Sequence, residues 1–215
     1  MDNILLRNET ESDYFIVETI TREAFWNLYT PGCVEHYLLH VLRKSDQFIP
    51  ELDYVAVLDG NIMGNIVYAK GNIAGDDGES CEVLTFGPVS VKPEFQKRGI
   101  GSRLIQHTKV LAQEMGFRAI LIYGDPGYYE RFGFLPAENF KIATSNNTYA
   151  VSLQALELYT GALSSCSGLF FEGSIYDVDP EAADVYDQNF SPKEKISGLP
   201  SQEKFQQIVS KQKPR

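Results

Sequence analysis

A short run of glycine and basic residues near the middle of the chain has the makeup of an anion-binding loop. It spans residues 96–103, follows an apolar run that ends at Val91, and opens an amphipathic pattern. The first N–H groups of a helix lack internal partners, and the helix dipole is positive at that end. Gly99 and Gly101 have no Cβ, so an anion can approach the backbone closely there. These residues predict a site for a phosphate or a pyrophosphate.

The pattern differs from two familiar phosphate-binding loops. No Gly-Lys-Ser or Gly-Lys-Thr closes it, as a P-loop requires, and the dinucleotide fingerprint Gly-x-Gly-x-x-Gly fails at Leu104. Taken alone, the two glycines also suit a tight turn into a well-capped helix.

Two segments of the chain resemble the signature motifs of the GNAT acetyltransferases. The residues from Gln96 to Gly101 match the pattern Gln/Arg-x-x-Gly-x-Gly/Ala, and Tyr129 to Phe134 matches Tyr-x-x-x-Gly-Phe after the next apolar strand. The resemblance covers residues 84–134. It implies an N-acetyltransferase that moves an acetyl group from acetyl-CoA to a primary amine of a small molecule or a protein, by direct attack in a ternary complex.

The resemblance also implies how the chain would hold acetyl-CoA. The backbone of Val89 and Val91 would bind the pantetheine arm like an added strand, the loop amides would hold the pyrophosphate, and guanidinium groups would meet phosphate oxygens. A backbone N–H near Val89 is the expected oxyanion donor. No metal is implied. The residues assigned to the cofactor in this way are Val89, Ser90, Val91, Gln96, Lys97, Arg98, Gly99, Ile100, Gly101, Ser102, Arg103 and Arg131.

Tyr129 matches the general-acid tyrosine of the family. A phenol with a reference pKa of about 10 is protonated at pH 7 and can donate to a leaving thiolate, although plain packing on the sheet is the other role open to it. The family's usual base position falls on Thr85 or Gly87, and neither side chain can take a proton. Glu82, acting through water, and Asp125, in the turn after the next strand, are the two candidates for the base.

Hydrophobic spacing predicts the elements that must position these residues. Helical spacing covers residues 14–25, 34–42 and 100–115, and strand-like runs cover 54–58, 62–69, 81–91, 119–123 and 149–156. Residues 71–80 are polar and rich in glycine, so we expect a loop there. Pro88 cannot donate to a ladder, so the strand over 81–91 should bulge or end beside it.

The order of these elements predicts an α/β or α+β fold. The resemblance implies a GNAT fold: a mixed, mostly antiparallel central sheet, helices on both faces, and a wedge where strand 81–91 splays from strand 119–123. We expect a GNAT domain over residues 1–158 and an extension over 159–215 that packs on it. The last residues of that extension are expected to fray.

Composition and net charge limit the classes of partner that the chain could bind. The 215 residues carry a formal net charge of −10, which argues against nucleic-acid or anionic-membrane binding and mildly favours cationic partners such as amines. An acidic balance is also ordinary for soluble proteins, in which it mostly reports solubility. No apolar run approaches the roughly 20 residues that span a bilayer. Three cysteines lie far apart without a metal-binding spacing, and residues 1–4 lack the basic start of a signal peptide, which together fit the reducing cytoplasm.

Several side chains could have either a functional role or none beyond packing. His36 and His40 have the i, i+4 spacing of a zinc pair, but no third ligand is evident and chance is the more frequent explanation. Trp26 and Tyr29 could line the acceptor pocket or pack in the core. Aromatic residues of the extension could cover the acceptor site, form a homodimer contact or pack on the sheet; these are Phe170, Phe171, Tyr176 and Tyr186.

Two other functions stay open on the sequence. Because the usual base is missing, the chain could be a non-catalytic module that binds acyl-CoA. It could also transfer a longer acyl chain, since no motif reads the acyl length.

Overall fold

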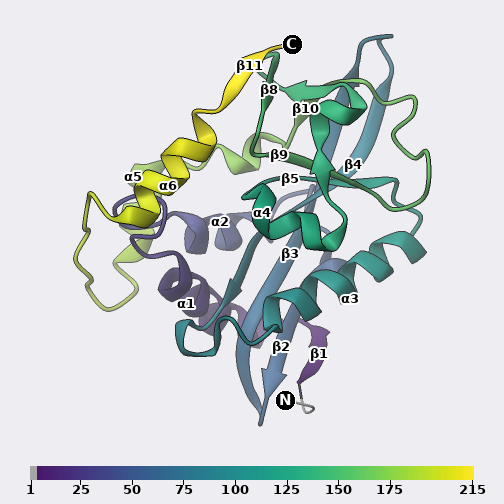
Figure 1. Ribbon diagram of the computed structural model, residues 1–215. Coiled ribbons are helices and arrows are strands. Elements are labelled where there is room, and N and C mark those ends of the chain that lie inside the picture. Colours follow the sequence, from purple (N-terminus) through teal and green to yellow (C-terminus); the bar gives the residue numbers. More distant parts are fainter. Residues whose placement is uncertain (1–3) are drawn as a thin grey trace.

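The computed structural model describes residues 4–215 and is organised around one large sheet (Figure 1). Nine strands form it, in the order β1-β2-β3-β4-β5-β9-β6, with β10 pairing with both β3 and β7. Every pairing is antiparallel except β4 with β5 and β10 with β7. The strands of the large sheet are β1 (Leu5–Asn8), β2 (Tyr54–Leu58), β3 (Asn61–Gly75), β4 (Ser80–Val91), β5 (Ala119–Tyr123), β6 (Leu135–Pro136), β7 (Ile142–Thr144), β9 (Leu153–Glu157) and β10 (Gly168–Phe171).

Helices cover both faces of the sheet, because successive residues of the long strand β3 point to opposite sides. Val67 and Ala69 pack with α1 (Tyr14–Phe25) and α2 (Glu35–Leu42). Tyr68 lies in the core on the other face, which α3 (Ile100–Glu114) covers. The mixed α/β fold class, with its mostly antiparallel sheet and helices on both faces, is confirmed.

Strands β4 and β5 separate soon after they meet. They share one pair of opposed residues, Leu84 and Ile120. On the other edge of β4, two residues, Gly87 and Pro88, stand opposite the single residue Val67 of β3, so the strand bulges there. The proline has no N–H to give to a ladder, which is why the sequence indicated a disturbance at this position. The predicted wedge between these two strands is present.

Most local elements lie where the hydrophobic spacing puts them, and β2 and β5 have the expected bounds. The predicted loop over residues 71–80 is wrong, because β3 continues to Gly75 and only four residues connect it to β4. The continuation is stabilised by β10, which pairs with β3 from Gly75 to Asn72. This partner comes from a distant part of the chain and leaves no signal in the local sequence.

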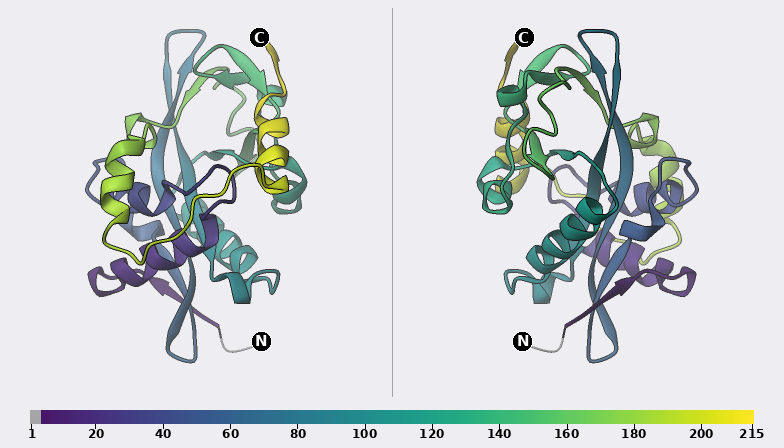
Figure 2. Two further views of the ribbon diagram at one scale, coloured as in Figure 1. Left: turned by 90° about the vertical axis from the view of Figure 1, so that its left-hand side faces the viewer. Right: turned by 90° about the vertical axis from the view of Figure 1, so that its right-hand side faces the viewer.

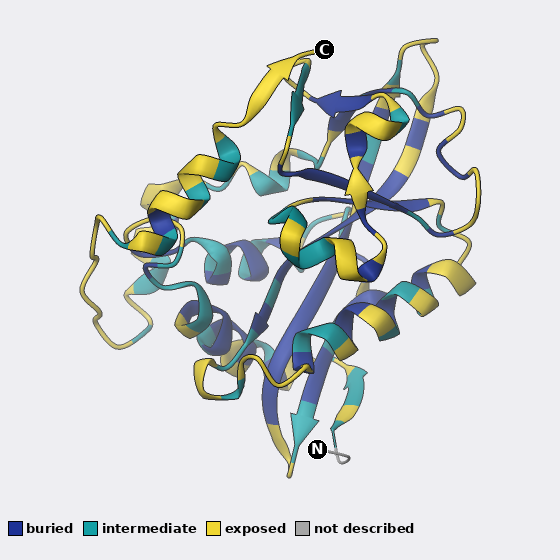
Figure 3. Cartoon of the chain, viewed as in Figure 1, coloured by how far each residue is buried: buried dark blue, intermediate teal, exposed yellow. Residues whose placement is uncertain are grey.

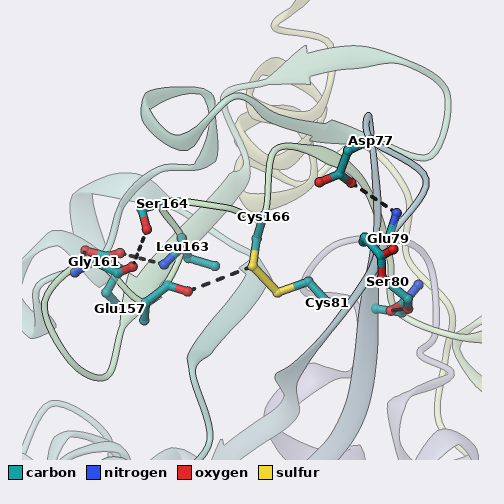
Figure 4. Close-up of a disulfide and its surroundings, with 11 residues drawn as sticks. Asp77, Glu79, Ser80, Cys81, Glu157, Gly161, Leu163, Ser164 and Cys166 are labelled. Carbon is teal, nitrogen blue, oxygen red and sulfur yellow. Dashed lines mark hydrogen bonds between the residues drawn. A yellow bond between two sulfur atoms is a disulfide. The ribbon is translucent and has the colours of Figure 1, made fainter.

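A disulfide joins Cys81 on β4 to Cys166, 85 residues later (Figure 4). It ties the loop before β10 to the sheet. The same loop is held by Glu157, whose carboxylate accepts a hydrogen bond from the Leu163 amide at 2.7 Å. Cys33 is a buried free thiol. The spacing of the three cysteines gave no reason to expect this pair.

The chain after Leu158 runs along a large part of the molecule (Figure 2). It adds β10 to the sheet, then α5 (Pro180–Asp187) against α2, then α6 (Pro200–Val209), whose outer surface is exposed (Figure 3). The last residues, which were expected to fray, have partners in the structure. The strand β11 (Gln212–Pro214) pairs with β8 (Thr148–Ala150), and the final Arg215 forms an ion pair with Asp76.

Residues 1–3, which the signal-peptide argument used, lie outside the described part of the chain. Within residues 4–215, no helix has both the length and the apolar character needed to cross a bilayer. The short helix α4 (Pro126–Tyr129) completes the main elements; Asp125, its N-cap residue, follows the end of β5 after Gly124.

Candidate active site

A cleft of about 660 Å³ lies between the end of β4, the start of α3 and helix α4. It brings together most of the residues that the sequence assigned to the cofactor. Its far wall is formed by the end of α1 and the residues that follow it. The cleft residues from the cofactor set are Val89, Ser90, Val91, Gln96, Lys97, Gly99, Ile100, Gly101, Ser102 and Arg131.

The loop before α3 has the backbone shape that presents amides to an anion. Gly99 is the N-cap residue with φ of 82°, and Lys97 has φ of 59°. The first hydrogen bond of the helix runs from the Arg103 amide to the Gly99 carbonyl at 3.0 Å. The amides before Arg103 therefore have no carbonyl one turn back and are free for a ligand. A Cβ on Gly99 would meet no atom within 4 Å, so the space beside it is open.

Positive side chains surround this loop in a chain that is acidic overall. Lys97, Arg98 and Arg103 are exposed. The Arg98 guanidinium stacks on Phe95 at 5.1 Å from the ring centroid, and Arg131 stacks on Tyr128 at 4.9 Å. These stacks leave the edges of both guanidinium groups available for phosphate oxygens. Arg98 and Arg103 border the cleft without being among the residues that line it.

The free edge of β4 faces the wedge. The Lys92 amide donates to the Met63 carbonyl of β3 at 2.8 Å, and the Ser90 carbonyl faces Gly64 of the same strand. Because peptide groups alternate in direction along a strand, those of Val89 and Val91 point to the opposite side. The Val91 carbonyl accepts a hydrogen bond from the Gln96 side chain at 3.1 Å, which holds the loop against the strand end.

Ser90 has a different role from its neighbours. Its hydroxyl is buried and lies 2.9 Å from the hydroxyl of Thr21 on α1, and it donates to the side chain of Asn65 on β3. These contacts anchor α1 to the strand that borders the cleft.

Tyr129 lies at the inner end of the cleft, half-buried among aromatic rings. Its ring centroid is 5.6 Å from that of Phe134 and 5.9 Å from that of Phe86. Burial raises the pKa of its phenol well above the ordinary value, so the group stays protonated. Gly124 makes room for this ring, since a Cβ there would overlap it.

The two acids predicted as proton acceptors lie in different places. Glu82 is exposed near the other end of β4, where it pairs with Lys70 at 3.2 Å, and it borders a separate depression beside the disulfide. Asp125 caps α4 by accepting from the Gly127 amide at 3.0 Å and pairs with Lys204 at 2.6 Å. Its hydrogen bond to Lys204 lowers the pKa of Asp125, which makes this carboxylate a weaker base.

A third acid, Glu172, was missed by sequence reasoning. It follows β10 directly, close to a tyrosine of β5 and a tyrosine of the tail. Burial and, to a smaller extent, the charge of Glu172 raise the pKa of both Tyr123 and Tyr176. The Tyr176 hydroxyl donates to the carbonyl of Gly87 at the bulge of β4, at 3.4 Å. Burial, with a smaller contribution from Asp177, raises the pKa of Glu172 to about 7. No motif surrounds Glu172, so only the fold shows that it lies near the wedge.

The two histidines considered as a zinc pair contact residues of the tail instead. The ring of His36 contacts Asp187 and Cys33, and burial lowers the pKa of His36 to about 4. His40 contacts Glu18 and Tyr186. Within residues 4–215, no group of three or more metal-ligating side chains is arranged to hold an ion.

Comparison with known proteins agrees with this geometry. A family model described as the acetyltransferase (GNAT) domain matches residues 51–136. The Escherichia coli K12 protein named uncharacterized N-acetyltransferase YhbS is 26% identical over 167 residues, which cover 77% of this chain and 94% of that protein. A second E. coli K12 protein, uncharacterized N-acetyltransferase YjhQ, is 30% identical over 105 residues, which cover 48% of this chain and 57% of that protein.

Solved structures share the fold over most of the chain. The crystal structure of E. coli YhbS in complex with CoA has a TM-score of 0.72 at 23% identity and covers 81% of this chain and 92% of its own. A GNAT family acetyltransferase from Brucella melitensis in complex with acetyl-CoA has a TM-score of 0.65 at 25% identity. The match covers 82% of this chain and 100% of that chain. The match to the family model and the N-acetyltransferase relatives support a GNAT-superfamily N-acetyltransferase, as the two motifs indicated, and the solved structures share its fold.

Proposed function

We propose that the protein transfers an acetyl group from acetyl-CoA to a primary amine. The observation that carries the proposal is the joining, in one cleft, of the open edge of β4 with the amides that begin α3. The open edge of β4 suits an extended amide-containing arm, and the amides that begin α3 suit a diphosphate. Among the solved relatives, one is bound to CoA and another to acetyl-CoA.

The cofactor residues named from the sequence fit this ligand. The peptide groups of Val89 and Val91 would pair with the pantetheine amides, and the amides of residues 97–102 would hold the pyrophosphate. Lys97, Arg98 and Arg131 would supply compensating charge. Bound in this way, acetyl-CoA brings a thioester, whose carbonyl carbon is the electrophile.

Each chemical demand of the transfer has a residue to meet it. The Val89 N–H would donate to the oxygen that becomes negative as the amine nitrogen bonds to the carbonyl carbon. Tyr129 would give its proton to the sulfur as the carbon–sulfur bond breaks. Glu172 would take the proton that the amine must lose, because it lies near Tyr176, which contacts the bulge of β4, and has a pKa near the working pH.

The proton acceptor is the part of the mechanism that departs most from the sequence prediction. Glu172 replaces Glu82 and Asp125 as our candidate, since Glu82 is exposed and paired with Lys70, and Asp125 is held by Lys204. Thr85, at the family's usual base position, is fully buried and close to Tyr176, so the tail supplies a side chain where the strand cannot.

Thiol release tests the proposed function. The protein is mixed with acetyl-CoA and a panel of primary amines, and free CoA is measured with a thiol reagent alongside CoA binding by calorimetry. We expect CoA to bind and at least one amine to release thiol well above the amine-free rate. Binding without release on any amine would favour a non-catalytic acyl-CoA module, and the absence of binding would remove the assignment altogether. Longer acyl-CoA donors in the same assay define the acyl length.

A further inference from the structure

A second, largely apolar pocket of about 510 Å³ lies beside the cofactor cleft, under the C-terminal helix α6. Both cavities are lined by Leu28, Tyr29 and Tyr128, so they meet along one shared wall. The volume is in the range that holds a small organic molecule and is too small for a folded protein segment of any length. Its position puts an occupant next to the end of the cleft where Tyr129 lies.

The tail of the chain builds one side of this pocket. Phe205 of α6 stacks on Tyr29 with ring centroids 4.6 Å apart. Ile208 and Val209 continue the apolar lining, and Tyr123 at the end of β5 faces it from the sheet. The only ionic pair at the rim is Asp125 with Lys204, which neutralise one another.

Hydrogen bonds fix α6 in this position. The carbonyl of Glu194 accepts from the side chains of Trp26 and Asn27, at 2.9 and 3.0 Å. The buried side chain of Gln202, on the first turn of α6, donates to the Asn27 carbonyl at 3.1 Å. The helix is therefore tied to the same loop that carries Leu28 and Tyr29, and the pocket has a defined shape without a ligand.

We propose that this pocket binds the body of the acceptor, and that the acceptor is a small amine with an aromatic or bulky apolar group, of the arylalkylamine class. The proposal rests on the acetyl-transfer function proposed above and adds the substrate class. Flat aromatic walls favour a ring, and the neutralised rim offers no partner for a second charge on the ligand. The amino group, on a short arm, would reach along the shared wall to the cleft. The net charge of −10 favours the approach of a cationic amine.

Direct binding tests the proposal without any need for turnover. The amine 2-phenylethylamine is titrated into the CoA-loaded protein by calorimetry, with ethanolamine as a small polar comparison. We expect 2-phenylethylamine to bind at least tenfold more tightly than ethanolamine. Phe205→Ala should weaken its binding about tenfold, and Ile208→Trp, which fills the pocket, should abolish it, with CoA affinity unchanged in both variants. Tyr159→Ala, an aromatic truncation at an exposed position far from the pocket, should change neither.

The outcomes separate the two proposals. If 2-phenylethylamine binds no better than ethanolamine, or binds the two pocket variants as well as the wild type, the substrate class is overturned even when thiol release from another amine upholds the acetyltransferase. If the amine binds as expected but no thiol is released, the pocket assignment stands and the catalytic proposal fails. Circular dichroism of each variant establishes that α6 remains folded.

Discussion

The guanidinium of Arg22, only 2% exposed, binds the carboxylate of Asp187, although 165 residues separate them in the chain. The Nε–Oδ1 distance is 2.5 Å and the Nη2–Oδ2 distance is 3.0 Å. The same guanidinium lies over the ring of Trp26, 4.3 Å from its centroid. This pair joins α1 to the end of α5 and so holds the tail, whose helix α6 lines the second pocket.

Removal of the Asp187 carboxylate should leave the buried Arg22 guanidinium with only a longer contact to Glu23, at 3.8 Å. We expect Asp187→Asn to reduce the free energy of unfolding by about 3 kcal/mol, because breaking a buried ion pair costs roughly 3–5 kcal/mol. Urea denaturation followed by fluorescence measures the change. The matched control is Asp184→Asn on the same helix, whose pair with Lys195 is exposed and should be worth less than about 1 kcal/mol. Equal effects of the two substitutions would contradict this account.

The loop glycines allow a sharper comparison. Gly99 and Gly116 lie at the two ends of α3 with φ of 82° and 84°, and a Cβ on either would meet no atom within 4 Å. Alanine at either position should cost about 1–2 kcal/mol of stability, because φ is positive. Only Gly99→Ala should also raise the Kd for CoA, by about tenfold or more, since its Cβ would enter the open space of the proposed phosphate site. Calorimetric titration with CoA checks this, and a similar loss of affinity in both variants would place the phosphates elsewhere.

Tyr129→Phe tests the proposed general acid. The variant keeps the aromatic packing with Phe86 and Phe134 but has no proton to give, so kcat should fall about 100-fold. The Kd for CoA should stay within twofold. Steady-state thiol release and calorimetry give the two numbers, and Tyr159→Phe serves as the control. A variant that keeps the wild-type kcat would assign Tyr129 to packing alone.

The pKa of Glu172 sets the expected pH dependence. The carboxyl must be ionised to accept a proton, so kcat/KM should rise with pH to a plateau, with a midpoint near 7. Glu172→Gln should remove this rise and lower kcat/KM at pH 8 by about 100-fold. Glu82→Gln and Asp125→Asn, the acids suggested by the sequence, should keep the midpoint. The groups that face Glu172 are Tyr123, Tyr176 and Asp177, and both phenols stay protonated over this range.

Stability provides a second readout for the same carboxyl. Its pKa in the folded protein lies above the ordinary value of about 4.3, so the folded state binds more protons than the unfolded state at intermediate pH. The free energy of unfolding should therefore decrease as pH rises from about 4.5 to 7, and Glu172→Gln should flatten part of that decrease. A profile unchanged by the substitution would show that the carboxyl is not buried in solution.

The disulfide between Cys81 and Cys166 closes a long loop. Loop-closure entropy predicts a stabilisation of about 4 kcal/mol for a separation of 85 residues. Urea denaturation with and without a reducing agent measures it. Under denaturing, non-reducing conditions a thiol reagent should detect Cys33 alone. Detection of three thiols would show that the bond does not form.

The sequence predicted best what depends on neighbouring residues. The turn at Gly99, the amphipathic face of α3 and the bulge beside Pro88 all follow from local chemistry. The cleft brings together most of the residues that the sequence assigned to acetyl-CoA, and their roles in binding remain predictions. β3 shows where this reasoning ends, because its last five residues look like a polar loop and become a strand only when β10 pairs beside them.

The acceptor side of the site depends on contacts between distant residues. Glu172 reaches the wedge after the chain has crossed the sheet, and Phe205 meets Tyr29 across 176 positions. Neither residue lies in a recognisable pattern, since a single acid after a strand and a single aromatic on a helix are common. Sequence reasoning named Tyr29 because it follows α1, but its partner could only be found in three dimensions.

The single pair of residues shared by β4 and β5 has a consequence for how the ligand would act on the whole molecule. A sheet normally transmits rigidity through its ladder of main-chain hydrogen bonds, and here that ladder is interrupted at the centre. Acetyl-CoA lying along Val89 and Val91 would supply hydrogen bonds where those between β4 and β5 are missing. While it is bound, the substrate would bridge the two parts of the sheet, so the two halves of the protein would be most firmly coupled during the reaction.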